Sequence, residues 1–230
     1  IEAGVPIELR DLTDGAYHVD VVGRNAAGIW QSFDGATRSK VWNVDTGRNP
    51  VLISEVLALN HSIDILGATP DLVELHNNSD ASFDLSGMTL SDDLSEPDKF
   101  RFDDGTTIGP GAFMTLLASE SNSSTQLELG FRWDRDGEGL YLHDANGDLI
   151  DFVEFGMQIA DKSISRLGHD MDWGLSEPTF GEANVAAVTG TPQSLRINEW
   201  LAISDVRFTG DFLELHNADT VPVPLGGLYL

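Results

Sequence analysis

Short apolar and alternating segments, separated by turn residues, recur along the chain. Residues 72–76 and 99–102 alternate between apolar and polar side chains, and residues 113–118 form an apolar run. Alternation with a period of two is typical of a β-strand with one buried face. The pattern predicts further strands at 53–59, 139–143 and 148–155. No segment holds a helical apolar period beyond about two turns, so we expect an all-β chain.

Turn residues stand between these strands. Asn146-Gly147 lies between the strands expected at 139–143 and 148–155, and this pair favours the positive φ of a hairpin turn. The segment Ile108-Gly109-Pro110-Gly111 provides another turn just before the apolar run. Strands at close intervals with turns between them predict a β-sandwich.

Three sequence blocks occur twice in the same order. Residues 53–58 (ISEVLA) return at 197–202 (INEWLA), 71–77 (DLVELHN) at 211–217 (DFLELHN), and 85–90 (LSGMTL) at 225–230 (LGGLYL). A repeat of this length indicates a duplicated domain and not a solenoid. We therefore expect a complete module at 50–188, a linker at 189–194, and the N-terminal part of a second module at 195–230. We expect the chain to be a fragment of a longer protein.

The first 48 residues follow a different pattern, with short strands expected at 7–10, 17–22 and 39–44. Leu12, the Asp14-Gly15 turn and Tyr17 resemble the tyrosine corner of immunoglobulin-like sandwiches. Residues 41–46 resemble the last strand of bacterial immunoglobulin-like or fibronectin type III repeats. About 48 residues cannot supply seven strands. We interpret residues 1–48 as the C-terminal half of an immunoglobulin- or fibronectin-like domain.

The central module resembles the lamin tail domain in its bacterial form. The motifs that carry the resemblance are, in chain order, residues 53–55, 72–77, 84–92, 105–106, 108–111, 140–144, Gly147, 151–153, 165–167, Trp173 and Asn184. One departure is the segment Pro178-Thr179-Phe180-Gly181, where the family usually has Pro-Gly. The resemblance implies an immunoglobulin-like β-sandwich without catalytic residues. It also implies a module that accompanies exported or surface proteins in bacteria, often beside hydrolase domains.

The composition narrows the range of partners. The net charge is −25, from 38 acidic and 13 basic residues, and no Lys/Arg cluster is present, so we expect no nucleic-acid partner. No apolar run approaches the ~18 residues of a membrane span, so we expect no membrane insertion in this fragment. The absence of cysteine excludes disulfides and thiol catalysis. We expect an extracellular or cell-surface location, with a protein or a cell-surface polysaccharide as partner.

Two acidic loops are candidate calcium sites, since calcium prefers oxygen ligands. Asp144, Asn146 and Asp148 belong to the first loop, and Asp136 belongs to the second. The first loop departs from the EF-hand pattern, because Gly147 stands fourth instead of sixth and Phe155 stands at the twelfth position instead of Glu. A hairpin turn explains the same residues without metal. We expect no other cofactor.

Two further features have alternative interpretations. Trp133 adjoins an acidic loop and is the candidate for an exposed, carbohydrate-stacking ring. A Glu-x-His pattern recurs at Glu74 and His76 and at Glu214 and His216. It predicts either a metal pair or, as we favour, a polar strand face on which Glu accepts hydrogen bonds from backbone donors at a sheet edge.

No known catalytic motif appears in the sequence. There is no Gly-x-Ser-x-Gly elbow, no His-x-x-x-His pair and no phosphate-binding glycine motif, so we expect no enzymatic activity. We interpret the chain as a non-catalytic structural, adhesive or protein-binding module of a larger secreted or cell-surface bacterial protein. Two alternatives stay open: an accessory carbohydrate-binding module of an exported hydrolase, and a calcium-rigidified adhesin segment.

Overall fold

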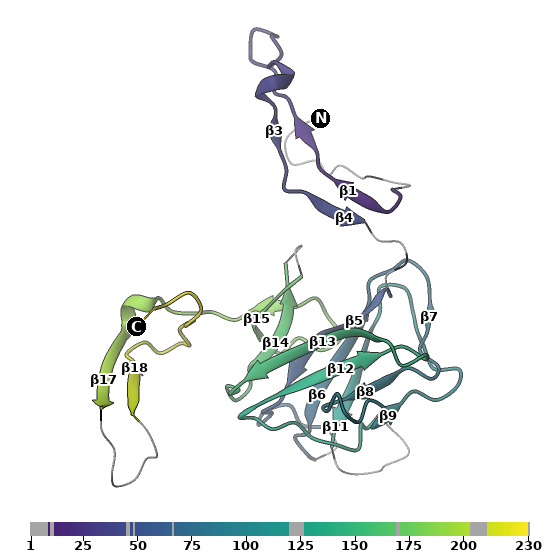
Figure 1. Cartoon of the computed structure of the whole chain (residues 1–230), viewed down its shortest axis with the longest axis vertical. Helices are drawn as coiled ribbons and strands as arrows, with labels where there is room; N and C mark the ends of the chain where they lie inside the picture. The colour runs from purple at the N-terminus through teal and green to yellow at the C-terminus, as the bar shows by residue number, and fades with distance from the viewer. Residues whose placement is uncertain are drawn as a thin grey trace. The chain divides into compact units, whose positions relative to one another are not determined.

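A computed structural model describes residue 9, residues 12–44, residue 47, and residues 49–65, 67–119, 127–168, 171–202 and 211–229. The chain divides into two compact units, residues 1–49 and 50–230 (Figure 1). Strands are the main regular secondary structure among the described residues of both units, with short 3₁₀ turns only at Phe33–Gly35 and Pro192–Ser194. No helix in this part of the chain is long and apolar enough to cross a membrane. The expected all-β fold class is confirmed.

The first unit contains two short antiparallel strand pairs. Strand β1 (Gly15–Tyr17) pairs with β4 (Trp42–Val44), and β2 (Asp20–Val21) pairs with β3 (Thr37–Arg38). The Tyr17 hydroxyl donates a 2.8 Å hydrogen bond to the carbonyl of Thr13, as the tyrosine of a tyrosine corner does. The strand expected at 7–10 lies outside the described residues, except for Leu9. The assignment of this unit to half of an immunoglobulin- or fibronectin-like domain stays a prediction.

Two antiparallel sheets form the central module. The six-stranded sheet has the order β11 (Phe113–Ala118), β6 (Asp71–Asn77), β5 (Val51–Leu57), β14 (Ser163–Leu167), β15 (Asp172–Glu177) and β16 (Val185–Ala186). The four-stranded sheet has the order β13 (Leu149–Gly156), β12 (Gly137–His143), β8 (Thr89–Ser91) and β9 (Phe100–Arg101). A short ribbon joins β7 (Phe83–Asp84) to β10 (Thr107–Ile108).

The strands expected from alternation in the central module are all present. The observed bounds differ from the expected ones by two residues or fewer. The short strands β7, β8 and β10 were not expected, and neither were the last three strands, β14, β15 and β16. They widen the six-stranded sheet, because β14 pairs with β5 and is followed outward by β15 and β16.

Apolar side chains from both sheets meet in one core, and the two sheets lie face to face in Figure 1. On β6, Val73 and Leu75 are fully buried in this core, whereas Leu72 belongs to a separate cluster on the opposite face. The alternation that predicted the strand therefore also predicted its two faces. Fully buried partners come from the four-stranded sheet and its loops, among them Leu85, Leu90, Leu140 and Leu142.

A buried ion pair ties the two sheets together. Asp151 on β13 accepts a 2.8 Å hydrogen bond from the backbone N–H of Ile53 on β5 and lies 2.6 Å from the Arg166 guanidinium on β14. Arg166 also donates to the Ile53 carbonyl, and its guanidinium lies 4.5 Å from the ring centre of Trp173. Because both charged side chains are largely buried, loss of either one would leave the other uncompensated, at a cost of about 3–5 kcal/mol.

A second apolar cluster covers the outer face of the six-stranded sheet. Leu57, Leu72 and Leu117 form it, with Ile63, Ile65 and Phe180 packed against them. We call residues 178–184 the outer strap, since this segment crosses that face. The strap is held by backbone hydrogen bonds, from Thr179 to Glu55 at 3.1 Å and from Gly181 to Glu74 at 2.5 Å. Asn184 adds a 3.1 Å bond to the carbonyl of Ser54.

The two carboxyl groups under the strap are fully buried neighbours. A β-bulge between Ile53 and Glu55 places Glu55 directly opposite Glu74 on β6. Burial raises the pKa of Glu74 to about 7; the hydrogen bond from Gly181 opposes this shift, and the nearby charge of Glu55 adds to it. Burial also raises the pKa of Glu55. The interpretation that Glu74 accepts from a backbone donor is confirmed, although β6 is an interior strand and not a sheet edge.

A hairpin near the C-terminal end repeats the geometry of β5 and β6. Strand β17 (Leu195–Leu201) pairs with β18 (Phe212–Asn217), and Glu199 lies opposite Glu214 as Glu55 lies opposite Glu74. A bulge again precedes the first Glu of the pair. The Asn217 amide donates to the carbonyl of Val221, as Asn77 does to Ala81 in the central module.

We predict that Glu74→Gln removes a pH dependence of stability. Folding raises the Glu74 pKa from 4.5 to about 7, so the folded state is favoured most at low pH and loses stability as the pH rises through this range. The full effect is up to about 3 kcal/mol. Glutamine still accepts from Gly181 and cannot ionise. Urea unfolding at pH 5 and pH 8 should therefore show the variant to be more stable than the wild type at pH 8, and its stability should differ less between the two pH values than that of the wild type.

The matched control is Glu182→Gln, which changes an exposed carboxylate on the same strap. It should retain the wild-type difference between the two pH values. If Glu74→Gln also retained that difference, another group would be responsible for it, and the assignment to the buried pair would be wrong.

Candidate functional site

A polar cleft opens at one end of the central sandwich. The end of β5 and the beginnings of β6 and β12 meet there, together with the loops 58–70 and 132–138. The cleft has a volume of about 680 Å³. Ligand sites of small molecules typically have volumes of about 300–1,000 Å³. Its polar and aromatic lining residues include His61, Asp71, Arg132, Trp133, Arg135 and Glu138.

A buried carboxyl group contributes to the lining of the cleft. Asp71 at the start of β6 is only 6% exposed, and burial raises its pKa, opposed by a hydrogen bond from the backbone of Asn60 and by the charge of Arg132. The Asn60 side chain is occupied within its own loop, where it donates to Pro70 and accepts from Ile63. Asn60 therefore shapes the loop, and Asp71 is the buried charged group that a ligand in the cleft would meet.

The segment 129–134 alternates in burial although it forms no strand. Leu129, Phe131 and Trp133 are buried in the core, whereas Gly130, Arg132 and Asp134 are exposed. The expectation that Trp133 is exposed is wrong: it is 5% exposed, and its ring packs edge-on against Phe131 at 6.0 Å. Its ring face is thus not free to stack on a sugar. The indole N–H is buried without a hydrogen-bond partner among the described residues.

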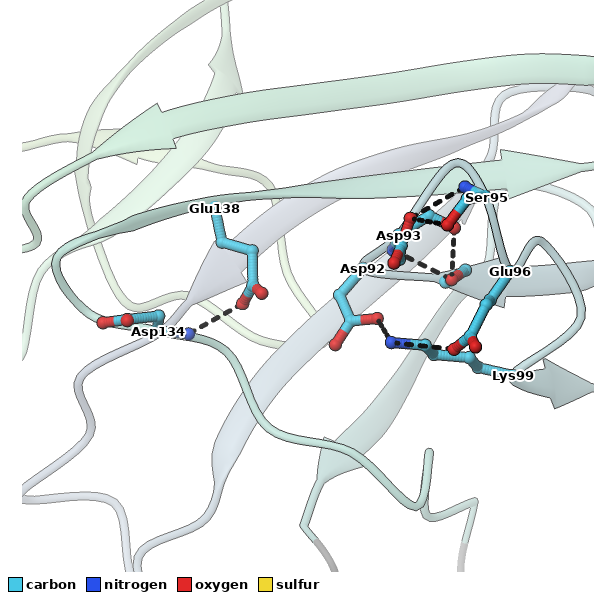
Figure 2. A network of polar contacts seen from close by, with 8 residues as sticks. Asp92, Asp93, Ser95, Glu96, Lys99, Asp134 and Glu138 are labelled. Carbon is cyan, nitrogen blue, oxygen red and sulfur yellow. Dashed lines mark hydrogen bonds and ion pairs between the residues drawn. The ribbon is translucent and has the colours of Figure 1, made fainter.

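Figure 2 shows Asp134 and Glu138, which line the cleft, together with the neighbouring acidic loop 92–96, which does not contribute to the lining. Glu138 accepts a 2.7 Å hydrogen bond from the backbone N–H of Asp134. Burial raises the Glu138 pKa; that hydrogen bond opposes the shift, and the charges of Asp92 and Asp134 add to it. Asp92 is neutralised separately, since Lys99 lies 2.6 Å from it and 3.6 Å from Glu96. The hydrogen bond to Asp92 raises the Lys99 pKa, so this lysine stays charged.

The first predicted calcium loop is a hairpin turn in which the Asp144 carboxylate accepts hydrogen bonds from the turn itself. Asp144 accepts hydrogen bonds from the backbone of Asn146 at 2.8 Å and of Asp148 at 2.9 Å. The bond from Asp148 is the main cause of a lowered Asp144 pKa. Gly147 has φ +88°, as the turn requires. The turn is therefore explained without metal.

The second predicted loop lies at the other end of strand β12. Asp136 donates through its backbone to the Asp134 side chain at 2.9 Å, just before β12 begins. A seven-residue strand separates the two loops by roughly 20 Å, so Asp136 cannot share one ion with the first loop. Within the described residues, no group of three or more His, Asp or Glu side chains could hold a metal ion. Calcium in either loop stays a prediction.

Residues 45–157 match the family model of the Lamin Tail Domain, a non-catalytic family with an immunoglobulin-like fold. This segment is a lamin tail domain. The resemblance seen in the sequence motifs is confirmed, and so is the immunoglobulin-like fold class. No curated protein matches the chain.

The family match and the sandwich differ in extent. The match ends just after β13, whereas β14, β15 and β16 continue the six-stranded sheet to Ala186. Arg166 of β14 completes the ion pair with Asp151, and the outer strap follows β15. In this lamin tail domain, the segment after the match therefore supplies half of the six-stranded sheet and the cover of its outer face.

We predict that Asp144→Ala lowers the midpoint of thermal unfolding modestly, because the hairpin loses two backbone hydrogen bonds. The decrease should be the same in chelator and in millimolar calcium. Asp148→Ala is the matched control: the turn uses the backbone N–H of this residue, so its substitution should have little effect. A decrease that grows in calcium for both variants would instead assign the loop to a bound ion.

Proposed function

We propose that this chain belongs to a larger secreted or cell-surface bacterial protein, in which lamin tail domains in tandem act as non-catalytic structural, adhesive or protein-binding modules. In this proposal residues 50–188 are one module, 189–194 a linker, and 195–230 the start of a second module. Residues 1–48 are the end of a preceding immunoglobulin- or fibronectin-like domain.

The observation that carries the proposal is the repeated hairpin. Strands β17 and β18 have the same residue pairing as β5 and β6, including the bulge and the opposed Glu pair. Yet positions that are buried in the first copy are exposed or only half-buried in the second. Trp200 is 72% exposed where Val56 is fully buried, and Ile197 is 57% exposed where Ile53 is fully buried.

An apolar sheet face of this kind needs a second sheet to cover it. In the lamin tail domain that cover is the four-stranded sheet with its loops. We infer that the hairpin is the first part of another sandwich of the same kind, whose second sheet would bury Trp200 and Ile197. Tandem sandwiches of this type make a stiff, repetitive array, which suits a spacer or a scaffold.

The use of buried charge supports a non-catalytic role. Glu55 and Glu74 accept hydrogen bonds from the outer strap, and Asp151 and Arg166 join the two sheets. These groups have perturbed pKa values or low exposure, which often mark active sites. Here their partners are backbone groups and each other, so they serve the fold. The strongly acidic surface suits a soluble protein exposed to a saline medium.

Protease treatment of intact cells that produce the protein tests this proposal. A surface-exposed array should release a resistant fragment that contains residues 50–188, with ends in the flanking segments, identified by mass spectrometry. The sandwich resists cleavage because its backbone is paired within sheets. Release only after cell lysis would contradict the surface location, and degradation without a stable fragment would contradict an autonomous module.

A further inference from the structure

We propose that the polar cleft of the lamin tail domain binds a neutral carbohydrate, held by hydrogen bonds and not by aromatic stacking. This binding function goes beyond the scaffold role proposed above. It does not depend on the location of the protein, so either proposal can fail without the other.

The cleft contains a buried charged group that faces an open space. Asp71 is among its lining residues and is 6% exposed, although burial of a carboxyl group is unfavourable. The other buried charges described above have close partners, such as Arg166 for Asp151. Asp71 has one backbone hydrogen bond from Asn60 and the more distant charge of Arg132, which leaves carboxylate lone pairs for a ligand.

A second observation points to the same cleft. Trp133 lines it, is 5% exposed, and has an indole N–H without a partner among the described residues. A buried donor without a partner costs about 1–3 kcal/mol, and native structures rarely keep one without a reason. The indole nitrogen is itself buried, so a ligand hydroxyl in the cleft would accept this hydrogen bond after a shift of the loop that carries Trp133. Trp133 thus enters the carbohydrate hypothesis as a donor, in place of the stacking ring expected from sequence.

The cleft is lined by groups of both charges, which favours a neutral, polar ligand. Three carboxyl groups, on Asp71, Asp134 and Glu138, share the lining with the guanidinium groups of Arg132 and Arg135. The carboxylates oppose a phosphate or another anion, and the guanidinium groups oppose a metal ion. The polar lining offers little to an apolar ligand. Sugar hydroxyls both donate and accept, so a neutral sugar can satisfy carboxylates, guanidinium groups and an indole N–H together.

Affinity gel electrophoresis of the whole chain tests the proposal. The probes are a neutral glucan, mannan, xylan and galactan, with alginate as an acidic polysaccharide. We expect at least one neutral polysaccharide to retard the wild type. Arg132→Gln and Asp71→Asn should weaken that binding at least tenfold, and Trp133→Phe, which removes only the N–H and part of the ring, should weaken it measurably.

Two control variants carry similar changes away from the cleft: Arg101→Gln and Asp148→Asn should bind like the wild type. Thermal unfolding of each variant separates lost binding from lost folding. Arg132 is exposed, so its variant should keep the fold even if Asp71→Asn does not. The proposal is overturned if no neutral polysaccharide retards the protein or if folded cleft variants bind like the wild type. Binding to alginate alone, abolished by salt, would also overturn it.

Discussion

Two carboxyl groups that are buried side by side need hydrogen-bond donors, and several parts of the domain are arranged to supply them. The bulge in β5 turns Glu55 toward Glu74, and neither side chain reaches water. Backbone N–H groups of the outer strap supply their hydrogen bonds, so the strap must cross the sheet at this place. Its passage brings Phe180 onto the outer apolar cluster. An interior strand face thereby gains a third layer, which a simple two-sheet sandwich does not have.

On both faces of the six-stranded sheet, buried charged groups are satisfied by partners within the domain. On the inner side Asp151 and Arg166 connect the sheets, and on the outer side the Glu pair connects sheet and strap. Both use the segment after β13 to satisfy charges on strands within the matched family region. The cleft differs from both faces, because Asp71 and the Trp133 indole are buried there with few hydrogen-bond partners within the domain. One Glu74 oxygen also lacks a hydrogen-bond partner among the described residues, but Glu74 lies under the strap, whereas Asp71 and Trp133 line a cleft.

Apolar runs and local alternation were sufficient to predict six strands of the central module and both faces of β6. The repeat could be detected in the sequence because the three blocks keep the same order in both copies, which requires no knowledge of strand pairing. The structure then shows the same pairing register in both hairpins. Strands β14 to β16 were not predicted from the sequence. In Ser163–Leu167 burial alternates, but serine and arginine occupy several of its positions, so the segment shows no apolar face in the sequence. Their burial depends on hydrogen bonds and an ion pair with distant residues, among them Asp151.

The cleft could not be predicted either, because it joins loops that are about 70 residues apart in the chain. The prediction that Trp133 is exposed was wrong for a local reason. Its acidic neighbours suggested a surface loop, whereas the alternation of Leu129, Phe131 and Trp133 with polar residues indicated burial. The calcium hypothesis relied on oxygen-rich composition, which the hairpin turn at Asp144 also requires. Composition alone does not distinguish a turn from an ion site.

The most direct test of the buried Glu pair is an NMR titration of side-chain carboxyl carbons in the folded chain. The Glu74 signal, assigned by comparison with Glu74→Gln, should titrate with a pKa near 7, and the Glu55 signal should titrate above the ordinary value for glutamate. The amide protons of Thr179 and Gly181 should shift in step with these carboxyl signals. Titration of both carboxyl groups near 4.5 would show that they are solvated and would contradict the central place given to this pair.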